Sequence, residues 1–335
     1  MPGPFVLIDF ALAYAALSPN GRSFLRRQRS RKKSGRAPES IGLLKNRSSR
    51  LSLICSLKIC DAVFVESVPE TVGAASGRKT SDLYFRFVPF AWIILEIWRR
   101  LLAAYGISPH EDDLRLLVLL NFVHREWNDL ADEFPPEVLY RCLRAEDPPE
   151  PWFGLVWHLT AAHNALARRK GRFEKLFQVW QKTMAFYDRP FKPDEAASYL
   201  EEKAALIQAS YAAAVLPEVP PGLAEALRRL YIWLLALDDA SDIDRDRALG
   251  RSTSMTLAAD PLGEIREYYR KCEEEIRRTA PRDPEPLLTL MKSLTADVEA
   301  AVRQGGDIEG DFHGARGTPV NRISDPSSPY RVGKA

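Results

Sequence analysis

From Leu83 onward, the apolar residues of this chain recur every three or four positions, and no run of alternating polar and apolar residues interrupts the pattern. This spacing places apolar side chains along one side of a helix. Glycine and proline divide the pattern into segments of the length typical for globular helices. We therefore predict an all-α fold, with helices at 83–105, 111–133, 135–145, 152–170, 172–188, 193–215, 221–249, 261–278 and 283–304.

The head of the chain differs in charge from the rest. Residues 1–80 hold 14 Lys and Arg but only 5 Asp and Glu, whereas the remainder holds 33 bases and 40 acids. Residues 19–60 contain Glu39 as their only acid, and such a segment buries too little apolar surface to fold. We predict a disordered basic extension over 1–80, one helical domain over 81–304 and a disordered tail over 305–335.

The basic extension has three open interpretations: a nucleic-acid-binding arm, an organelle-targeting segment, or a non-native extension of the reading frame. Aromatic residues for base stacking are sparse in it, so we do not expect a nucleic-acid partner. Four scattered cysteines indicate a reducing compartment. No apolar run reaches the ~20 residues of a membrane span, and the best candidate, Phe90–Trp98, contains Glu96. We expect a cytoplasmic protein without a membrane span.

An acidic cluster follows directly on the apolar stripe of the helix predicted at 221–249. The apolar stripe of this helix consists of Leu223, Leu227, Leu230, Leu234 and Leu237. The aspartates after it are Asp238, Asp239, Asp242, Asp244 and Asp246. If the helix continues, Asp238, Asp242 and Asp246 share roughly one face, where like charges repel. A hard divalent cation would offset this repulsion, and Mg²⁺ favours carboxylates and substrate phosphates. The alternative is a solvated helix end neutralised by Arg245 and Arg247.

Two further elements carry charges beside apolar stripes. Asp129 and Asp132 end the helix predicted at 111–133 and are neighbours at a spacing of three. Surface helices often contain such a pair, so an ordinary surface position is the alternative. Lys203 falls within the inward stripe of the helix at 193–215, where an unpaired cation would be costly. It pairs either with nearby Glu201-Glu202 or with an anion held between the two acidic helices.

These elements, in this order, resemble the polyprenyl diphosphate synthases of the class I isoprenoid synthase family. Asn128-Asp129-Leu130-Ala131-Asp132 stands in the place of the family's first DDxxD motif, and Lys203-Ala204-Ala205-Leu206-Ile207 in that of its Lys-Thr-x-x-Leu-Ile. Asp238-Asp239-Ala240-Ser241-Asp242 matches the second DDxxD, with Leu249-Gly250-Arg251 in place of Leu-Gly-Lys. The chain departs from the family at Asn128, in lacking Arg-Arg-Gly after the first motif, and in Leu235-Ala236 in place of Phe-Gln.

The resemblance implies a helical bundle around a central cavity and a prenyl diphosphate substrate. It implies that Lys203 and Arg251 contact the leaving oxygens as catalytic residues. It also implies Mg²⁺ ligands at Asp129, Asp132, Asp238, Asp239, Asp242 and Asp246. Prenyl chain elongation and terpene cyclisation both stay open, as do squalene or phytoene synthase-like relatives, and a homodimer is expected. The alternative is a catalytically inactive helical protein of the same fold.

Overall fold

The computed structural model describes residues 47–68, 80–131, 154–187, 189, 191–248, 250 and 252–303. Helices hold 85% of the described residues and no strand occurs among them, so the all-α prediction is confirmed. The longer helices are α3 (Arg47–Ser67), α5 (Thr80–Ala104), α6 (Glu111–Ala131), α8 (Gly154–Arg169), α9 (Phe173–Tyr187), α10 (Ala196–Val215), α11 (Pro221–Ser241), α14 (Pro261–Thr279) and α15 (Glu285–Arg303). The short ones are η3 (Pro193–Glu195), α12 (Ile243–Ala248) and α13 (Ser254–Leu257).

Most predicted helices within the described residues are found within a few residues of their expected ends. The helix predicted at 221–249 is the exception, because it is interrupted at Asp242 and divides into α11 and α12. Two of the predicted breaks are glycines in the left-handed region, Gly106 at φ 72° and Gly171 at φ 66°. Each follows a helix and lets the chain turn back on it, with Ile107 N donating to Leu102 O and Arg172 N to Ala167 O, both at 2.8 Å. This is the usual glycine ending of a helix, because only glycine adopts that φ without strain. The helix predicted at 135–145 lies outside the described residues.

Helix α3 corrects the prediction for residues 47–68, which the charge pattern places in a disordered extension. One side of α3 is buried in the core, at 5% exposure or less: Leu57, Cys60, Val63 and Phe64, together with Val68 directly after the helix. Their spacing of three and four is the helical period. The helix packs against α5 and α6. A basic, serine-rich composition hides this stripe, because polar residues can occupy the outer face while the few apolar residues gather inward.

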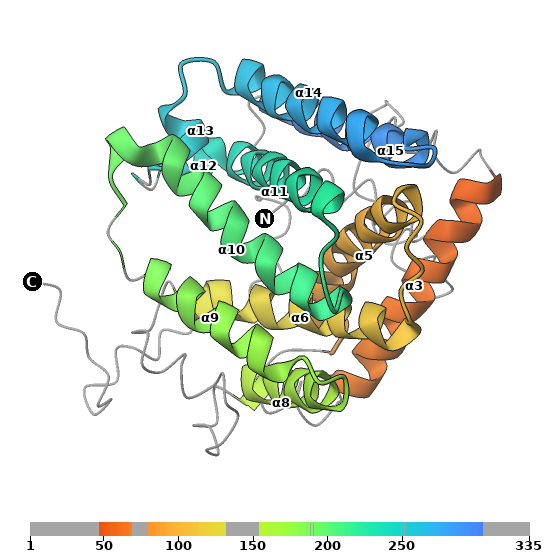
Figure 1. The fold of residues 1–335 in the computed structure, drawn as a ribbon. Helices are drawn as coiled ribbons and strands as arrows, with labels where there is room; N and C mark the ends of the chain where they lie inside the picture. Colours follow the sequence, from red (N-terminus) through yellow and green to blue (C-terminus); the bar gives the residue numbers. More distant parts are fainter. Residues whose placement is uncertain are drawn as a thin grey trace, which may run out of the picture.

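Helix α10 crosses the middle of the bundle in Figure 1, between α11 on one side and α6 and α9 on the other. Helices α14 and α15 cover α11, and α8 packs on α6 and α9. Buried hydrogen bonds between side chains connect these layers. Trp98 Nε1 of α5 donates to Tyr231 Oη of α11 at 2.9 Å, and Tyr211 Oη of α10 donates to Asn121 Oδ1 of α6 at 2.8 Å.

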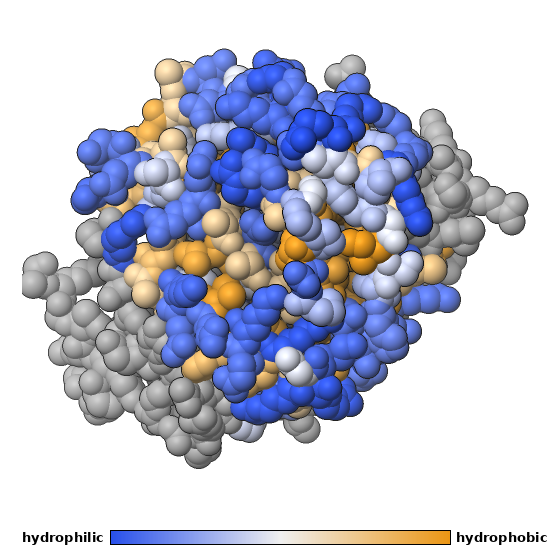
Figure 2. All heavy atoms as spheres, in the orientation of Figure 1, coloured by the Kyte–Doolittle hydropathy of each residue, from blue (hydrophilic) through white to orange (hydrophobic). Residues whose placement is uncertain are grey.

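Helix α14 shows how the outer layer is built. Its inward residues Ile265, Cys272 and Ile276 are fully buried, and Figure 2 shows hydrophilic residues over its outer side. Ion pairs such as Arg266 Nε–Glu299 Oε1 at 2.8 Å link this side to α15. Among the described residues, none of the helices combines the length and hydrophobicity that a membrane crossing requires.

Candidate functional site

The acidic end of α11 is positioned by a buried apolar stripe. Leu223, Leu227 and Leu230 are fully buried and Leu237 is 4% exposed, as their spacing predicts. This stripe fixes the rotation of α11, so Asp238 and Asp239, directly after it, are held at the edge of the core and are half-buried. One oxygen of Asp238, Oδ1, is buried. The acidic cluster therefore does not lie on an open, fully solvated face.

Asp238, Asp242 and Asp246 do not lie on one straight helix. Helix α11 ends at Ser241, and Asp242 leaves the helical conformation with φ −106° and ψ 9° before α12 begins. A helical hydrogen bond still spans this kink, from Asp246 N to Asp242 O at 2.8 Å. Asp246 is only 9% exposed. The three carboxylates thus follow a kinked path, which turns Asp246 into the protein.

Ser254 is a neighbour of the acidic cluster that the sequence prediction missed. It begins α13, and its Oγ donates to Asp239 Oδ2 at 3.0 Å. The preceding Thr253 caps α13 in a reciprocal pair with Thr256, in which Thr256 N donates to Thr253 Oγ1 at 3.2 Å. A Thr directly before the helix and another three residues later form a recognisable capping signal. The capped turn holds Ser254 against α11.

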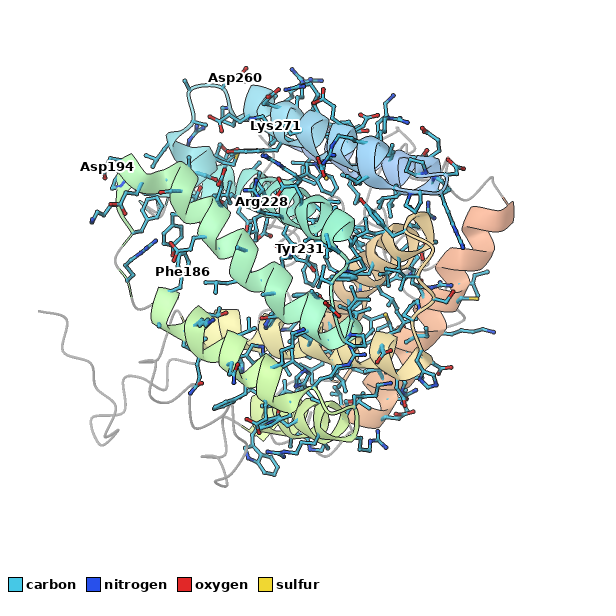
Figure 3. All side chains as sticks on the ribbon, in the orientation of Figure 1. Phe186, Asp194, Arg228, Tyr231, Asp260 and Lys271 are labelled. Atoms are coloured by element: carbon cyan, nitrogen blue, oxygen red, sulfur yellow. The ribbon has the colours of Figure 1, made fainter. Side chains whose placement is uncertain are left out.

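Lys203 is half-buried on α10 and makes an interaction within the protein. The register of α10 against α11 is set by two contacts. Arg228 Nη1 lies 3.4 Å from Glu201 Oε2, and Gln208 Nε2 donates to Ala224 O at 3.5 Å. Residue 203 therefore lies alongside residues near 228, and Asp238 is about 15 Å farther along α11 at ~1.5 Å per residue. Figure 3 labels Arg228 in this middle part of α11. Lys203 and Asp238 therefore lie at different positions along the axis of α11.

Glutamates and arginines are paired along this α10–α11 contact. Arg228 Nη2 lies 2.7 Å from Glu225 Oε1. The hydrogen bond from Arg228 lowers the pKa of Glu225, and burial only partly opposes it. Both side chains are about one-third exposed, so solvent limits the contribution of such a pair to about 1 kcal/mol or less. The Arg228–Glu225 pair lies within α11, so it is the Arg228–Glu201 pair that links the two helices and helps to set their register.

A further cation lies where the chain passes from α9 to α10. The Arg189 guanidinium stands over the Phe186 ring at 5.1 Å from its centroid and pairs with Glu202 Oε2 at 2.9 Å. The Phe186 and Tyr199 rings are themselves 4.5 Å apart. Figure 3 labels Phe186 at the end of α9. In the sequence, Arg189 only marks the end of a predicted helix before Pro190, so the position of its side chain was not predicted.

The first acidic motif is only partly within the described residues. Asp129 belongs to the last turn of α6, but its side chain, like Asp132 and Arg251, lies outside the described part. In Figure 1, α6 and α11 both run toward the left, and α10 runs back between them. The C-terminal ends of α6 and α11 therefore lie on the same side of the bundle. Helix C-termini carry partial negative charge, which adds to that of the aspartates.

Carboxylate oxygens are the donor type that Mg²⁺ prefers. Within the described residues, however, no group of three or more His, Cys, Asp or Glu side chains is arranged to hold a metal ion. Asp238, Asp239 and Asp242 can thus supply ligands of the right chemistry, while a complete coordination sphere needs ligands beyond them. The predicted additional ligands are Asp129 and Asp132, whose side chains lie outside the part of the chain that the structure describes.

Two histidines without a predicted role lie close together: His163 is in the core and His124 is half-buried at its edge. His163 is fully buried, and burial lowers its pKa to about 4. His124 has a pKa lowered to about 3, by burial and then by the nearby His163. Both are therefore neutral at pH 7 in the folded protein.

We expect His163 to make the protein acid-sensitive. Its folded pKa lies below the usual 6.5, so its contribution to stability is complete above pH 6.5 and is lost as the pH falls toward 4. Between pH 6.5 and 5, the free energy of unfolding should drop by about 1.5 kcal/mol more in the unmodified protein than in His163→Gln. Urea titrations at several pH values measure this. His110→Gln, at an exposed site, is the control; parallel profiles for the unmodified protein and His163→Gln would refute the expectation.

Scans of the chain against protein-family models, curated proteins and solved structures find no match. The arguments for function therefore rest on the residues and their arrangement.

Proposed function

We propose that this chain is a Mg²⁺-dependent isoprenoid synthase that acts on allylic prenyl diphosphates, by chain elongation or cyclisation. The observation that carries the proposal is the acidic end of α11. There a buried leucine stripe holds Asp238 and Asp239 half-buried, on the side of the bundle where α6 also ends. Carboxylates held against an apolar core, instead of on a free surface, favour a role in binding a cation.

Each part of the proposed site has a chemical task. Mg²⁺, when bound, neutralises the charge that develops on a diphosphate leaving group. Asp238 and Asp242 are the residues of the described chain that would hold it, with Asp129 and Asp132 as the predicted second set. Lys203 would contact the end of the diphosphate farthest from Asp238. Because Lys203 and Asp238 are offset by about 15 Å along α11, Lys203 would supply fixed positive charge to the diphosphate and would not take part in holding the metal ion.

Departure of the diphosphate would leave an allylic carbocation, which apolar and aromatic side chains would shield. The candidates in the sequence are Phe122, Trp127, Trp157 and Trp233, and not all of them are available for that task. Phe122 and Trp233 are fully buried, and Trp233 Nε1 donates to Thr295 Oγ1 at 3.2 Å. Both are packed core residues. Trp127 and Trp157, the other two candidates, lie in the contact of α6 and α8.

The test is incubation of the full chain with allylic diphosphates, with and without isopentenyl diphosphate and Mg²⁺, followed by product analysis. Asp238→Asn together with Asp242→Asn should reduce Mg²⁺-dependent turnover by at least about 100-fold, since both remove metal-binding charge. Asp244→Asn is the matched control, because Asp244 is an exposed acid of the same cluster. Equal loss in the control, or no product from the unmodified protein with any diphosphate, would count against the proposal.

Lys203→Met tests the cation separately. If Lys203 binds diphosphate, the change should abolish the rise in melting temperature that pyrophosphate plus Mg²⁺ produces, because that rise reports ligand affinity. Calorimetry of both proteins measures it, and Lys192→Met, at an exposed site, is the control. A large drop in melting temperature without ligand, with the pyrophosphate effect unchanged, would show that Lys203 pairs with a protein carboxylate and is structural.

A catalytically inactive protein of the same fold is the second candidate. It is favoured by two observations: Asp239 already accepts a hydrogen bond from Ser254, and Lys203 already has an interaction within the protein. Such internal pairing satisfies charges that an enzyme would keep for its ligand. Pyrophosphate binding without any product would favour this candidate over the enzyme.

A further inference from the structure

Helices α6, α8 and α9 meet in a buried aromatic layer. The Trp180 ring of α9 lies 4.9 Å from Trp127 of α6 and 4.8 Å from His163 of α8, measured between ring centroids. These three side chains are 4% exposed or less. Thr160, one helical turn before His163, is fully buried as well. Trp157, one turn farther back, continues the same side of α8.

Each of these residues carries a buried polar atom that finds no hydrogen-bond partner in the described part of the chain. The atoms are Nε1 of Trp127, Trp157 and Trp180, Oγ1 of Thr160 and Nε2 of His163. A buried donor without an acceptor loses its hydration without compensation. Five such atoms on three adjoining helices would remove a large part of a domain's marginal stability. A bound molecule that forms hydrogen bonds with these atoms would offset this loss of stability.

Comparison with the other tryptophans and threonines shows that this is a local property. Trp98 donates to Tyr231 Oη at 2.9 Å, and Trp233 to Thr295 Oγ1 at 3.2 Å. Thr183 and Thr295 each donate their hydroxyl to the carbonyl four residues earlier in their own helix. Thr160 is also inside a helix and has a carbonyl at that spacing, yet it makes no such bond with any described residue. Its hydroxyl is left for another partner.

The polarity of the five atoms defines the chemistry of the occupant. His163 Nδ1 lies 3.3 Å from Asn164 Oδ1; this oxygen can only accept, so Nδ1 carries the proton and Nε2 presents a lone pair. The three indoles are donors only. Neutral N–H donors repel a metal cation, and uncharged groups alone do not compensate a buried anion. A neutral oxygen, which accepts from the indoles and, as a hydroxyl or water, donates to Nε2, fits this set.

We propose that the contact of α6, α8 and α9 is a binding site for a neutral oxygen-bearing ligand, held by the indole N–H groups of Trp127 and Trp180, the Thr160 hydroxyl and His163 Nε2. Two sources share this chemistry: ordered water and a small alcohol, since both accept and donate through one oxygen. The site does not depend on the proposed diphosphate chemistry. Its experiments need neither Mg²⁺ nor turnover, so they can fail or succeed independently of the proposed function.

Indole N–H signals in a ¹H–¹⁵N NMR spectrum of the full chain test the proposal, assigned with Trp→Phe variants. Trp127 and Trp180 should resonate at hydrogen-bonded positions, like Trp98 and Trp233, which are internal standards. Cross-peaks to water identify water as the occupant. A saturable shift on adding methanol, confined to Trp127 and Trp180, identifies a small alcohol as a ligand. Signals at the position of unbonded indole, unmoved by methanol, would overturn the proposal.

Thr160→Val supplies a second measurement, since it keeps the shape and removes the hydroxyl. It should lower the melting temperature and shift the Trp127 and Trp180 signals, because the occupant loses one partner. Thr295→Val is the matched control and should shift the Trp233 signal instead. An unchanged or higher melting temperature for Thr160→Val, without any indole shift, would mean that the contact is dry and would overturn the site.

Discussion

Replacing Glu96 by alanine should lower the free energy of unfolding by about 3–5 kcal/mol. Glu96 lies in the middle of α5 and is fully buried. It accepts hydrogen bonds from Ser56 Oγ of α3 at 2.6 Å and from Arg100 Nε at 2.7 Å. Arg100 in turn donates to Pro286 O, at the start of α15, at 2.6 Å. Without Glu96, the buried Arg100 guanidinium would keep its charge and lose its counterion.

Two further variants test the Glu96 prediction: a surface control and a double variant that removes both buried charges. Glu66→Ala removes a carboxylate that pairs with Arg115 on the surface, and it should cost about 1 kcal/mol or less. The double variant Glu96→Leu with Arg100→Met removes both buried charges, and it should recover much of the stability lost by Glu96→Ala. Urea unfolding of the four proteins measures these differences. A loss below about 1 kcal/mol for Glu96→Ala would show that the pair contributes as little as a surface ion pair.

Val63→Asp should destabilise the protein by at least about 3 kcal/mol, because it both removes apolar burial and places a carboxylate in the core. Val63 is 2% exposed on the inward side of α3. Val65→Asp is its matched control: the same change, two residues farther along the same helix, at a side chain that is 72% exposed. The control should change stability by no more than about 0.5 kcal/mol.

This pair of variants tests whether α3 belongs to the folded domain. Thermal and urea unfolding, followed by far-ultraviolet circular dichroism, report the loss of helix. If α3 were detached, both substitutions would be equally mild. Deletion of residues 1–75, which the disordered-extension hypothesis predicts to be harmless, should instead expose the apolar residues that α3 covers and destabilise the remaining helices.

The helices of this protein were largely determined by local sequence. Helical periodicity and glycine or proline breaks act over a few residues, so the stripe of α11 and the end of α5 at Gly106 could be predicted from short windows. The acidic cluster was visible for the same reason, since it lies within one turn and a half of that helix's end. A prediction of which side chains are buried follows from the same stripe, and four of its five leucines are indeed buried.

Tertiary structure decided what depends on residues far apart in the chain. The inward face of α3 gains its burial from α5 and α6, which a composition of basic residues does not predict. Glu96 looks like an isolated charge in an apolar run, but Ser56, 40 residues earlier, is one of its partners. The register of α10 on α11 sets Lys203 and Asp238 apart along the helix axis, although Lys203 lies on a predicted inward stripe and Asp238 directly follows another. Such contacts result from packing between helices, and periodicity within one helix carries no information about its offset from the next.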